Sequence, residues 1–190
     1  MARRRHRCVG RGWQQSLLCR HARAEGVRDF WKPRLKMCPR SSKVSSLIDA
    51  PVDEVFRFHE RHDAFALLSP AFPPVRRIGG TGGIETGARV ELRAGGIRWA
   101  ALHTAYEKDR LFVDEQIRGP FAKWVHRHEF EAAGGKTRLT DRIEYELPGG
   151  SLVNKLFGWT VIPGLRIMFA HRHRVTRETC EKRQGLSLGS

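Results

Sequence analysis

The segment from Leu111 to Pro148 constrains the fold of this chain more than any other part of the sequence. It reads LFVDEQIRGPFAKWVHRHEFEAAGGKTRLTDRIEYELP, and a Gly-Pro pair and a Gly-Gly pair divide it into three runs. Within each run, side chains two positions apart lie on one face of a β-strand. Gly-Pro and Gly-Gly pairs are typical of turns. The segment therefore predicts three consecutive antiparallel strands.

One face of these three strands combines aromatic side chains with groups that ionise. Its rows are Phe112, Asp114 and Gln116, then Trp124, His126, His128 and Phe130, then Leu139, Asp141, Ile143 and Tyr145. If the rows face the same way, they form a concave apolar surface that carries two histidines and two carboxylates. An apolar surface with a few polar groups is typical of a ligand pocket.

The residues before this segment predict further strands and two short helices. Residues 43–50 read as a strand, and Pro51 opens a helix at its favoured first position, with Asp53 and Glu54 in the first turn. A second short helix covers residues 64–68. Three more strands are predicted over residues 75–78, 89–93 and 97–106. Consecutive hairpins form an antiparallel sheet whose apolar face must be covered.

A long helix is predicted after Pro148, where the apolar period changes from two to about 3.6. Pro163 and Gly164 are expected to kink or split this helix. Lys155 and Arg166 lie inside its apolar stretch, and each would cost roughly 3 kcal/mol at the centre of a bilayer. We therefore expect no transmembrane helix, although transient contact with a membrane is compatible with the sequence. This helix is the long amphipathic element that can cover the sheet.

The first 40 residues form a basic extension. They carry twelve of the chain's 35 Lys and Arg side chains, against Glu25 and Asp29. A nucleic-acid binder usually spreads its basic charge over a folded face, so no specific nucleic-acid partner is expected. The extension is expected to be disordered, an over-long start before Met37, or an organelle transit peptide. The folded domain is expected over residues 41–184, with a disordered tail at 185–190, and in the cytoplasm unless the extension directs import.

The cysteines and glycines show no metal or cofactor motif. Cys8, Cys19, Cys38 and Cys180 lie far apart and form no CxxC pair, so reduced thiols are expected. The GGTGG run at residues 79–83 lacks the Lys-Ser/Thr pair and the following helix of a phosphate-binding loop. No cofactor is therefore predicted.

Four stretches of the sequence carry a family resemblance. They are IDAPVDEVFRFHER, FVDEQIRGPFAKWVHRHEFE, GGKTRLTDRIEYELP and FAHRHRVT, all within residues 41–178. They resemble the START-like superfamily, also called SRPBCC, which includes polyketide cyclase/dehydrase-like proteins and lipid carriers. The resemblance implies an α+β helix-grip fold, with a curved antiparallel sheet of about seven strands, two short helices after the first strand, and a long C-terminal helix. A ligand cavity would lie between the sheet and that helix.

The resemblance implies that the domain binds a hydrophobic small molecule or lipid. An alternative is a cyclase/dehydrase-type enzyme in which a His-Asp pair exchanges protons, with His126, His128, Asp114 and Asp141 as the catalytic candidates. A second alternative is a non-catalytic regulatory module whose cavity is filled by side chains. The predicted ligand contacts are Trp99, Phe112, Asp114, Gln116, Trp124, His126, His128, Phe130, Tyr145, Phe169 and Arg172.

The paired histidines have two further interpretations. A metal site would need a third ligand, which Asp114 or Asp141 would have to supply from a neighbouring strand. A buried network of these carboxylates, the histidines and Arg172 balances the same charges, so no metal is predicted. Arg172 itself needs a carboxylate from the sheet or an anionic group on the ligand. His59 and His62 are expected at an exposed, solvated end of a helix.

Overall fold

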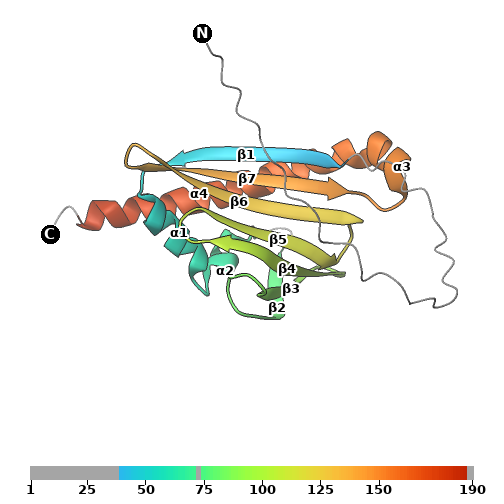
Figure 1. Cartoon of the computed structure of the whole chain (residues 1–190), viewed down its shortest axis with the longest axis horizontal. Helices are drawn as coiled ribbons and strands as arrows, with labels where there is room; N and C mark the ends of the chain where they lie inside the picture. Colours follow the sequence, from blue (N-terminus) through green and yellow to red (C-terminus); the bar gives the residue numbers. More distant parts are fainter. Residues whose placement is uncertain (1–38, 72–73, 188–190) are drawn as a thin grey trace, which may run out of the picture. The chain divides into compact units, whose positions relative to one another are not determined.

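Seven antiparallel strands form one curved sheet in the order β1-β7-β6-β5-β4-β3-β2 (Figure 1). The strands are β1 (Arg40–Ile48), β2 (Val75–Thr81), β3 (Arg89–Ala94), β4 (Ile97–Glu107), β5 (Leu111–Arg118), β6 (Lys123–Ala133) and β7 (Lys136–Glu146). The computed structural model describes residues 39–71 and 74–187. Disorder is predicted for residues 1–40 and 185–190, and residues 1–38 and 188–190 of these ranges lie outside the described residues.

Helices cover one face of this sheet and lie at one end of it (Figure 1). They are α1 (Val52–Glu60), α2 (Ala64–Leu68), α3 (Gly150–Phe157) and α4 (Val161–Ser187), with a short 3-10 helix, η1 (Gly158–Thr160), before α4. Two short helices follow the first strand and one long helix, α4, follows the sheet, so the predicted α+β architecture is confirmed. α4 continues past residue 184, where the sequence analysis places the end of the domain.

The C-terminal helical region is split before Pro163 rather than at Pro163 and Gly164. The break is η1, and Pro163 is the third residue of α4. A proline is tolerated there because the first N–H groups of a helix have no intrahelical acceptor. The Tyr145 hydroxyl donates to the Gly158 carbonyl oxygen at 2.7 Å, which ties the break to β7.

The Arg40 side chain donates hydrogen bonds to carbonyl groups at the end of α3. Its Nε donates to the Asn154 carbonyl oxygen at 2.9 Å, and its Nη2 donates to the Lys155 carbonyl oxygen at 2.7 Å. The last carbonyl groups of a helix lack intrahelical donors, so these bonds complete them. A Cβ atom on Gly158 would clash with the Arg40 side chain in this position, so glycine leaves room for it. Residue 40 therefore belongs to the folded domain and not to the extension.

The buried core consists of two apolar clusters with polar side chains between them on β6. The cluster near α1 includes Ile48, Val55, Phe56, Phe58, Phe112, Phe130 and Leu139. The cluster near the start of α4 includes Trp124, Ile143, Tyr145, Leu165 and Phe169. Trp124 and Phe130 belong to different clusters, so the buried His126 and His128 lie between the clusters along β6.

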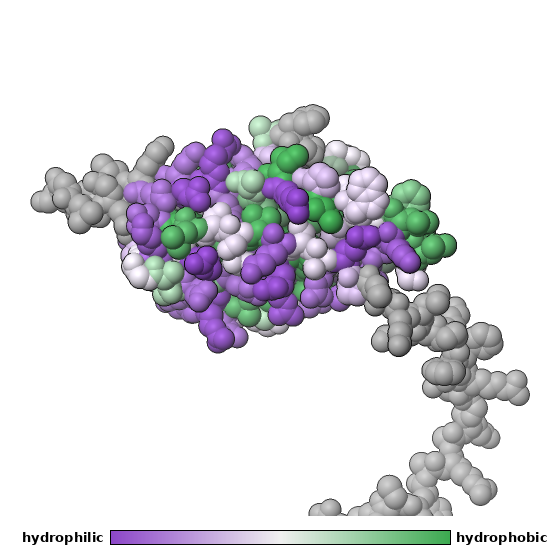
Figure 2. Space-filling view, turned by 90° about the horizontal axis from the view of Figure 1, so that it is seen from above, coloured by the Kyte–Doolittle hydropathy of each residue, from purple (hydrophilic) through white to green (hydrophobic). Residues whose placement is uncertain are grey.

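Several large apolar side chains remain exposed around α3. Leu152, Leu156, Phe157 and Trp159 are each more than half exposed, and we call these four residues the α3 patch. Figure 2 shows hydrophobic side chains gathered at the end of the molecule beside α3. None of the helices in the described part of the chain is both long enough and apolar enough to cross a membrane.

Candidate functional site

A cavity of about 540 Å³ lies between the sheet and the helices. Its wall comes from α1, α2, α4 and the strands β2 to β6. Most of this wall is apolar, with residues such as Leu92, Ala101 and Leu165. A smaller part of the wall is polar and carries the side chains that could do chemistry.

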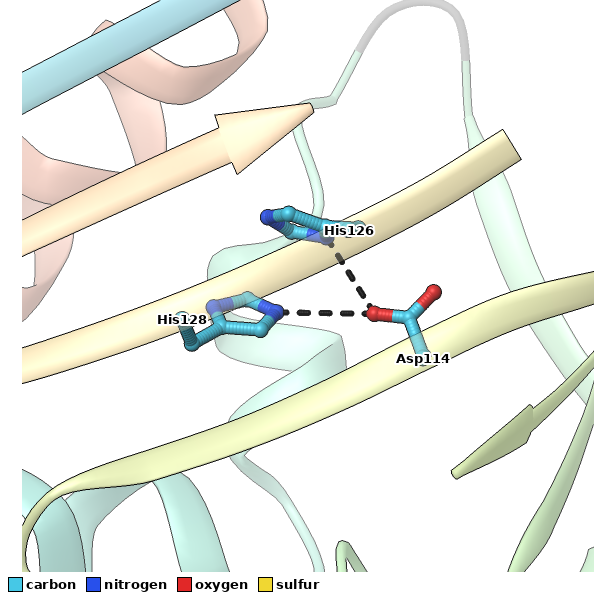
Figure 3. Close-up of side chains that lie close together, drawn as sticks. All are labelled: Asp114, His126 and His128. Atoms are coloured by element: carbon cyan, nitrogen blue, oxygen red, sulfur yellow. Dashed lines mark ion pairs between the residues drawn. The ribbon is translucent and has the colours of Figure 1, made fainter. Parts of the chain in front are cut away.

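The polar part of the wall centres on Asp114, His126 and His128 (Figure 3). Asp114 of β5 is directly opposite His126 of β6 in the strand register, and His128 lies two residues further along the same face. The Oδ2 atom of Asp114 is 3.2 Å from His126 Nδ1 and 3.6 Å from His128 Nε2. Both histidines are buried, whereas 17% of the Asp114 side chain is exposed.

Asp141 holds the same two histidines from the other side. Its Oδ1 atom is 2.8 Å from His126 Nε2 and 2.7 Å from His128 Nδ1. Its Oδ2 atom accepts a hydrogen bond from His173 Nε2 at 2.7 Å, and His173 Nδ1 is 2.9 Å from Ser46 Oγ. Asp141 therefore lies behind the histidines, away from the cavity, and connects β7 to α4.

The two carboxylates remain ionised despite their burial. Burial alone would raise the pKa of Asp114 and of Asp141, but the charges and hydrogen bonds of the neighbouring histidines hold both values below the ordinary range. For His126 the balance is reversed. Burial lowers its pKa, yet Asp114 and Asp141 outweigh this effect and leave the pKa raised. The site therefore concentrates negative charge that favours a proton or another cation between the strands.

His59 is a cavity residue that the sequence analysis places incorrectly at an exposed helix end. It is 7% exposed, and its Nδ1–H donates to the Val55 carbonyl oxygen at 2.8 Å. Burial lowers its pKa from 6.5 to about 3, and the charges of His128 and Arg172 act in the same direction. The spacing held a signal, because residues three and four apart share a helix face and His59 follows Val55 and Phe56 at those distances.

His103 of β4 is a second cavity histidine that the sequence analysis did not identify. It is opposite Asp114 in the strand register and is 7% exposed. Burial lowers its pKa, against the attraction of the Asp114 carboxylate. The alternation along β4 predicts which face His103 shares, but not that a carboxylate lies opposite.

Most of the predicted ligand contacts lie on the cavity wall, and three do not. Those on the wall are Trp99, Phe112, Asp114, Trp124, His126, His128, Phe169 and Arg172. Gln116 instead bonds the turn after β5, with its Nε2 donating to the Phe121 carbonyl oxygen at 2.7 Å. Phe130 packs in the cluster near α1, and the Tyr145 hydroxyl donates to the Gly158 carbonyl oxygen. A shared strand face does not bring every one of its residues to the cavity, because the sheet curves and the helices cover both ends of that face.

Arg172 lies on the cavity wall without an ion pair to any residue that the structure describes. Its Cζ atom is 5.7 Å from the centre of the Phe169 ring, which is a cation–π distance. Burial lowers the pKa of Arg172, and the more distant Asp141 and Asp114 charges oppose that effect. The carboxylates of the sheet pair with histidines, so they leave this guanidinium available to a ligand.

Comparison with known proteins places this fold in a family. The profile of the family described as polyketide cyclase / dehydrase and lipid transport matches residues 48–171. No curated protein matches the chain in a sequence comparison.

Three solved structures illustrate the likeness of this fold to known ones. A nucleoside-diphosphate sugar epimerase from Corynebacterium glutamicum shares 25% identity and a TM-score of 0.58, over 72% of this chain but only 28% of the epimerase. Norcoclaurine synthase from Thalictrum flavum, in complex with dopamine and hydroxybenzaldehyde, shares 13% identity and a TM-score of 0.57, over 76% of this chain and 88% of the synthase. The Zhui aromatase/cyclase from a Streptomyces species shares 12% identity and a TM-score of 0.57, over 77% of this chain and 96% of its own.

Proposed function

This chain belongs to the polyketide cyclase/dehydrase and lipid transport family, and on that premise we propose that it binds a hydrophobic small molecule or lipid between its sheet and α4. The observation that carries the proposal is the cavity of about 540 Å³, whose wall is mostly apolar. Ligand pockets typically measure about 300 to 1,000 Å³ and combine apolar walls with a few polar groups. A regulatory module with a filled interior would have no such space.

Arg172 supports a ligand that also carries an acidic group. Its guanidinium lies on the wall and has no carboxylate partner among the described residues. Charge-assisted hydrogen bonds to a carboxylate or sulfonate are stronger than neutral ones, and guanidinium binds such groups with two parallel N–H donors. The proposed ligand is therefore an amphiphile whose apolar body fills the cavity and whose acidic group meets Arg172.

A fluorescent amphiphile tests this proposal. Anilinonaphthalene sulfonate combines an aromatic body with one sulfonate, and its fluorescence rises in an apolar site. Val90 of β3 lines the cavity, so Val90→Trp is expected to fill part of it and weaken binding at least about tenfold, or about 1.4 kcal/mol. Arg89 is exposed on the opposite face, so Arg89→Trp adds the same side chain outside the cavity and should leave binding unchanged. Equal affinity in both variants would contradict binding in this cavity.

The α3 patch supports transient contact of the protein with an anionic lipid surface, from which a poorly water-soluble ligand would be collected. Its exposed aromatic and aliphatic side chains suit the interfacial region of a membrane, and the exposed Lys155 suits anionic headgroups. Cosedimentation with phosphatidylcholine/phosphatidylserine vesicles tests this contact. The double variant Phe157→Ser, Trp159→Ser should lose binding, whereas Ile117→Ser, at an exposed position on β5, should retain it.

Proton-transfer catalysis of the cyclase/dehydrase type is the second candidate function. The observation that favours it is the contact of His126 Nδ1 with Asp114 Oδ2 at the cavity wall, where a general acid or base would have to lie. If the protein is an enzyme, a ligand extracted from it should be chemically changed after prolonged incubation with the protein. Mass spectrometry distinguishes an enzyme from a carrier. The extracted ligand is measured before and after incubation with the wild-type protein and with His126→Gln.

A further inference from the structure

We propose that Asp114, His126 and His128 bind a divalent first-row transition metal ion at the polar part of the cavity wall. The three side chains each offer one ligand atom, and these atoms lie within 4.8 Å of one another. Figure 3 shows both imidazole rings directed at one oxygen of the Asp114 carboxylate. This proposal is independent of the hydrophobic ligand, because it concerns only the polar side chains.

The two separations from the Asp114 oxygen are close to the edges of a metal coordination shell. Bonds from zinc to nitrogen or oxygen measure about 2.0 to 2.2 Å, and the edge of a tetrahedron with such bonds measures about 3.3 to 3.5 Å. The Asp114 oxygen lies 3.2 Å from His126 Nδ1 and 3.6 Å from His128 Nε2. Direct charge-assisted N–H to carboxylate bonds are shorter, about 2.7 to 2.9 Å. The two contacts at Asp114 are therefore longer than such charge-assisted bonds and close to the spacing of ligands around an ion.

One ring nitrogen of each imidazole carries a hydrogen atom that points at Asp141. His126 Nε2 and His128 Nδ1 lie 2.8 and 2.7 Å from Asp141 Oδ1, and a carboxylate oxygen can only accept at such distances, so both nitrogens carry hydrogen. In the neutral tautomers, the lone pairs of His126 Nδ1 and His128 Nε2 then face Asp114. Three acceptors then meet at this point, where a proton or a metal ion would balance them.

A supporting layer holds these ligands in place. Histidine ligands of metals usually donate their second N–H to a carboxylate, which fixes the ring and its tautomer. Asp141 accepts from both candidate ligands, and it is itself held by His173, which contacts Ser46. The buried Asp141 does not face the cavity, so its role is to orient the two rings rather than to bind the ion.

The ligand set indicates the class of metal. Two imidazole nitrogens and one carboxylate oxygen suit zinc, iron, cobalt or nickel, whereas magnesium and calcium prefer oxygen ligands alone. Three protein ligands leave at least one coordination position open, and all three residues line the cavity. The open position would therefore face the space proposed for the small molecule.

Metal titration of the full chain tests this site. Zinc affinity is measured by competition with a chromogenic chelator, and cobalt loading is followed by its visible absorption. Asp114→Asn should remove one bound equivalent or weaken it by more than the roughly 10- to 100-fold that loss of a supporting residue costs. The control Asp49→Asn makes the same chemical change at an exposed carboxylate paired with Lys136, and should retain that equivalent. Identical metal affinity and stoichiometry in both variants would overturn the proposal.

A measurement on the wild-type protein does not require that any variant folds. Cysteines and histidines elsewhere in the sequence also bind zinc. The atoms bound to the metal therefore show whether it occupies this site. X-ray absorption of the chain loaded with one equivalent of cobalt should show two imidazole ligands with further nitrogen or oxygen atoms and no sulfur. A sulfur-containing shell, or a shell without histidine, would contradict the site. Neither result bears on binding of anilinonaphthalene sulfonate, so the two proposals fail independently.

Discussion

Asp141 and His173 join the sheet to the long C-terminal helix through one buried contact, with His173 Nε2 2.7 Å from Asp141 Oδ2. The same carboxylate holds His126 and His128 through its other oxygen. Asp141 therefore holds α4 against the sheet and orients the two cavity histidines. Several consequences of this arrangement are measurable.

Asp141→Asn should destabilise the fold strongly. Removing one partner from a buried charged network costs about 3 to 5 kcal/mol, because the remaining groups lose their counter-charge. Urea unfolding at neutral pH measures this loss as a change in the free energy of unfolding. Asp49→Asn is the matched control, because exposed ion pairs contribute less than about 1 kcal/mol. Similar losses in the two variants would show that Asp141 is not the central residue described here.

His59 should make the protein less stable as pH falls. Its pKa is about 3 in the folded chain and near 6.5 when unfolded, so the unfolded chain binds an extra proton between these values. Stability from this group is complete above pH 6.5 and is lost as pH falls toward 3. Between pH 7 and pH 5 the loss amounts to about 2 kcal/mol.

The variant His59→Leu isolates this contribution. His103 has a lowered pKa and acts with the same sign, whereas the raised pKa of His126 acts with the opposite sign. Both groups remain in the variant, so the difference between the two pH profiles from urea unfolding reports His59 alone. The control His62→Leu, at an exposed position, should keep the original slope. A slope unchanged in His59→Leu would contradict the burial of a neutral imidazole.

Tyr145→Phe should lower stability without changing ligand binding. The variant removes one of two hydrogen bonds to the Gly158 carbonyl oxygen, which also accepts from the Val161 N–H, at a cost of about 0.5 to 1.5 kcal/mol. The hydroxyl is directed at the helix break and not at the cavity wall. Urea unfolding and titration with anilinonaphthalene sulfonate, performed on the same preparation, separate these effects. Weaker binding with unchanged stability would return Tyr145 to the ligand contacts that the sequence predicts.

The strand alternation between Leu111 and Pro148 was sufficient to predict β5, β6 and β7, because a period of two is a local property of the chain. It could not say which carboxylate would face the cavity. Asp114 and Asp141 have equivalent positions in the pattern, yet one lines the wall and the other binds α4 from behind. That difference depends on where α4 crosses the sheet, which is a tertiary property.

The errors at His59 and Pro163 have a similar origin. The polar sequence around His59 favours a solvated helix end, but packing of α1 on Phe112 and Phe130 buries the ring. Pro163 was expected to break the helix, yet the first turn of a helix accepts proline and η1 makes the break before it. Local rules identify residues with unusual requirements, and the packing around them decides how those requirements are met.

Arg172→Met should discriminate between acidic and neutral ligands. Loss of a hydrogen bond to a charged group costs about 1.5 to 3 kcal/mol, so affinity for anilinonaphthalene sulfonate should fall roughly 10- to 100-fold. N-phenylnaphthylamine, the analogue without the sulfonate, should bind unchanged. Arg174→Met, at an exposed position two residues along the same helix, is the control. Equal weakening of both probes would indicate a change in the shape of the cavity rather than loss of an anion contact.

Native mass spectrometry of the full chain, purified without denaturation, tests the central claim most directly. We predict a bound hydrophobic molecule that organic extraction removes. Arg89→Trp should retain this molecule, and Val90→Trp, which fills part of the cavity, should lose it. A chain that shows only its own mass and also fails to bind anilinonaphthalene sulfonate would contradict the proposal that this cavity is a ligand site.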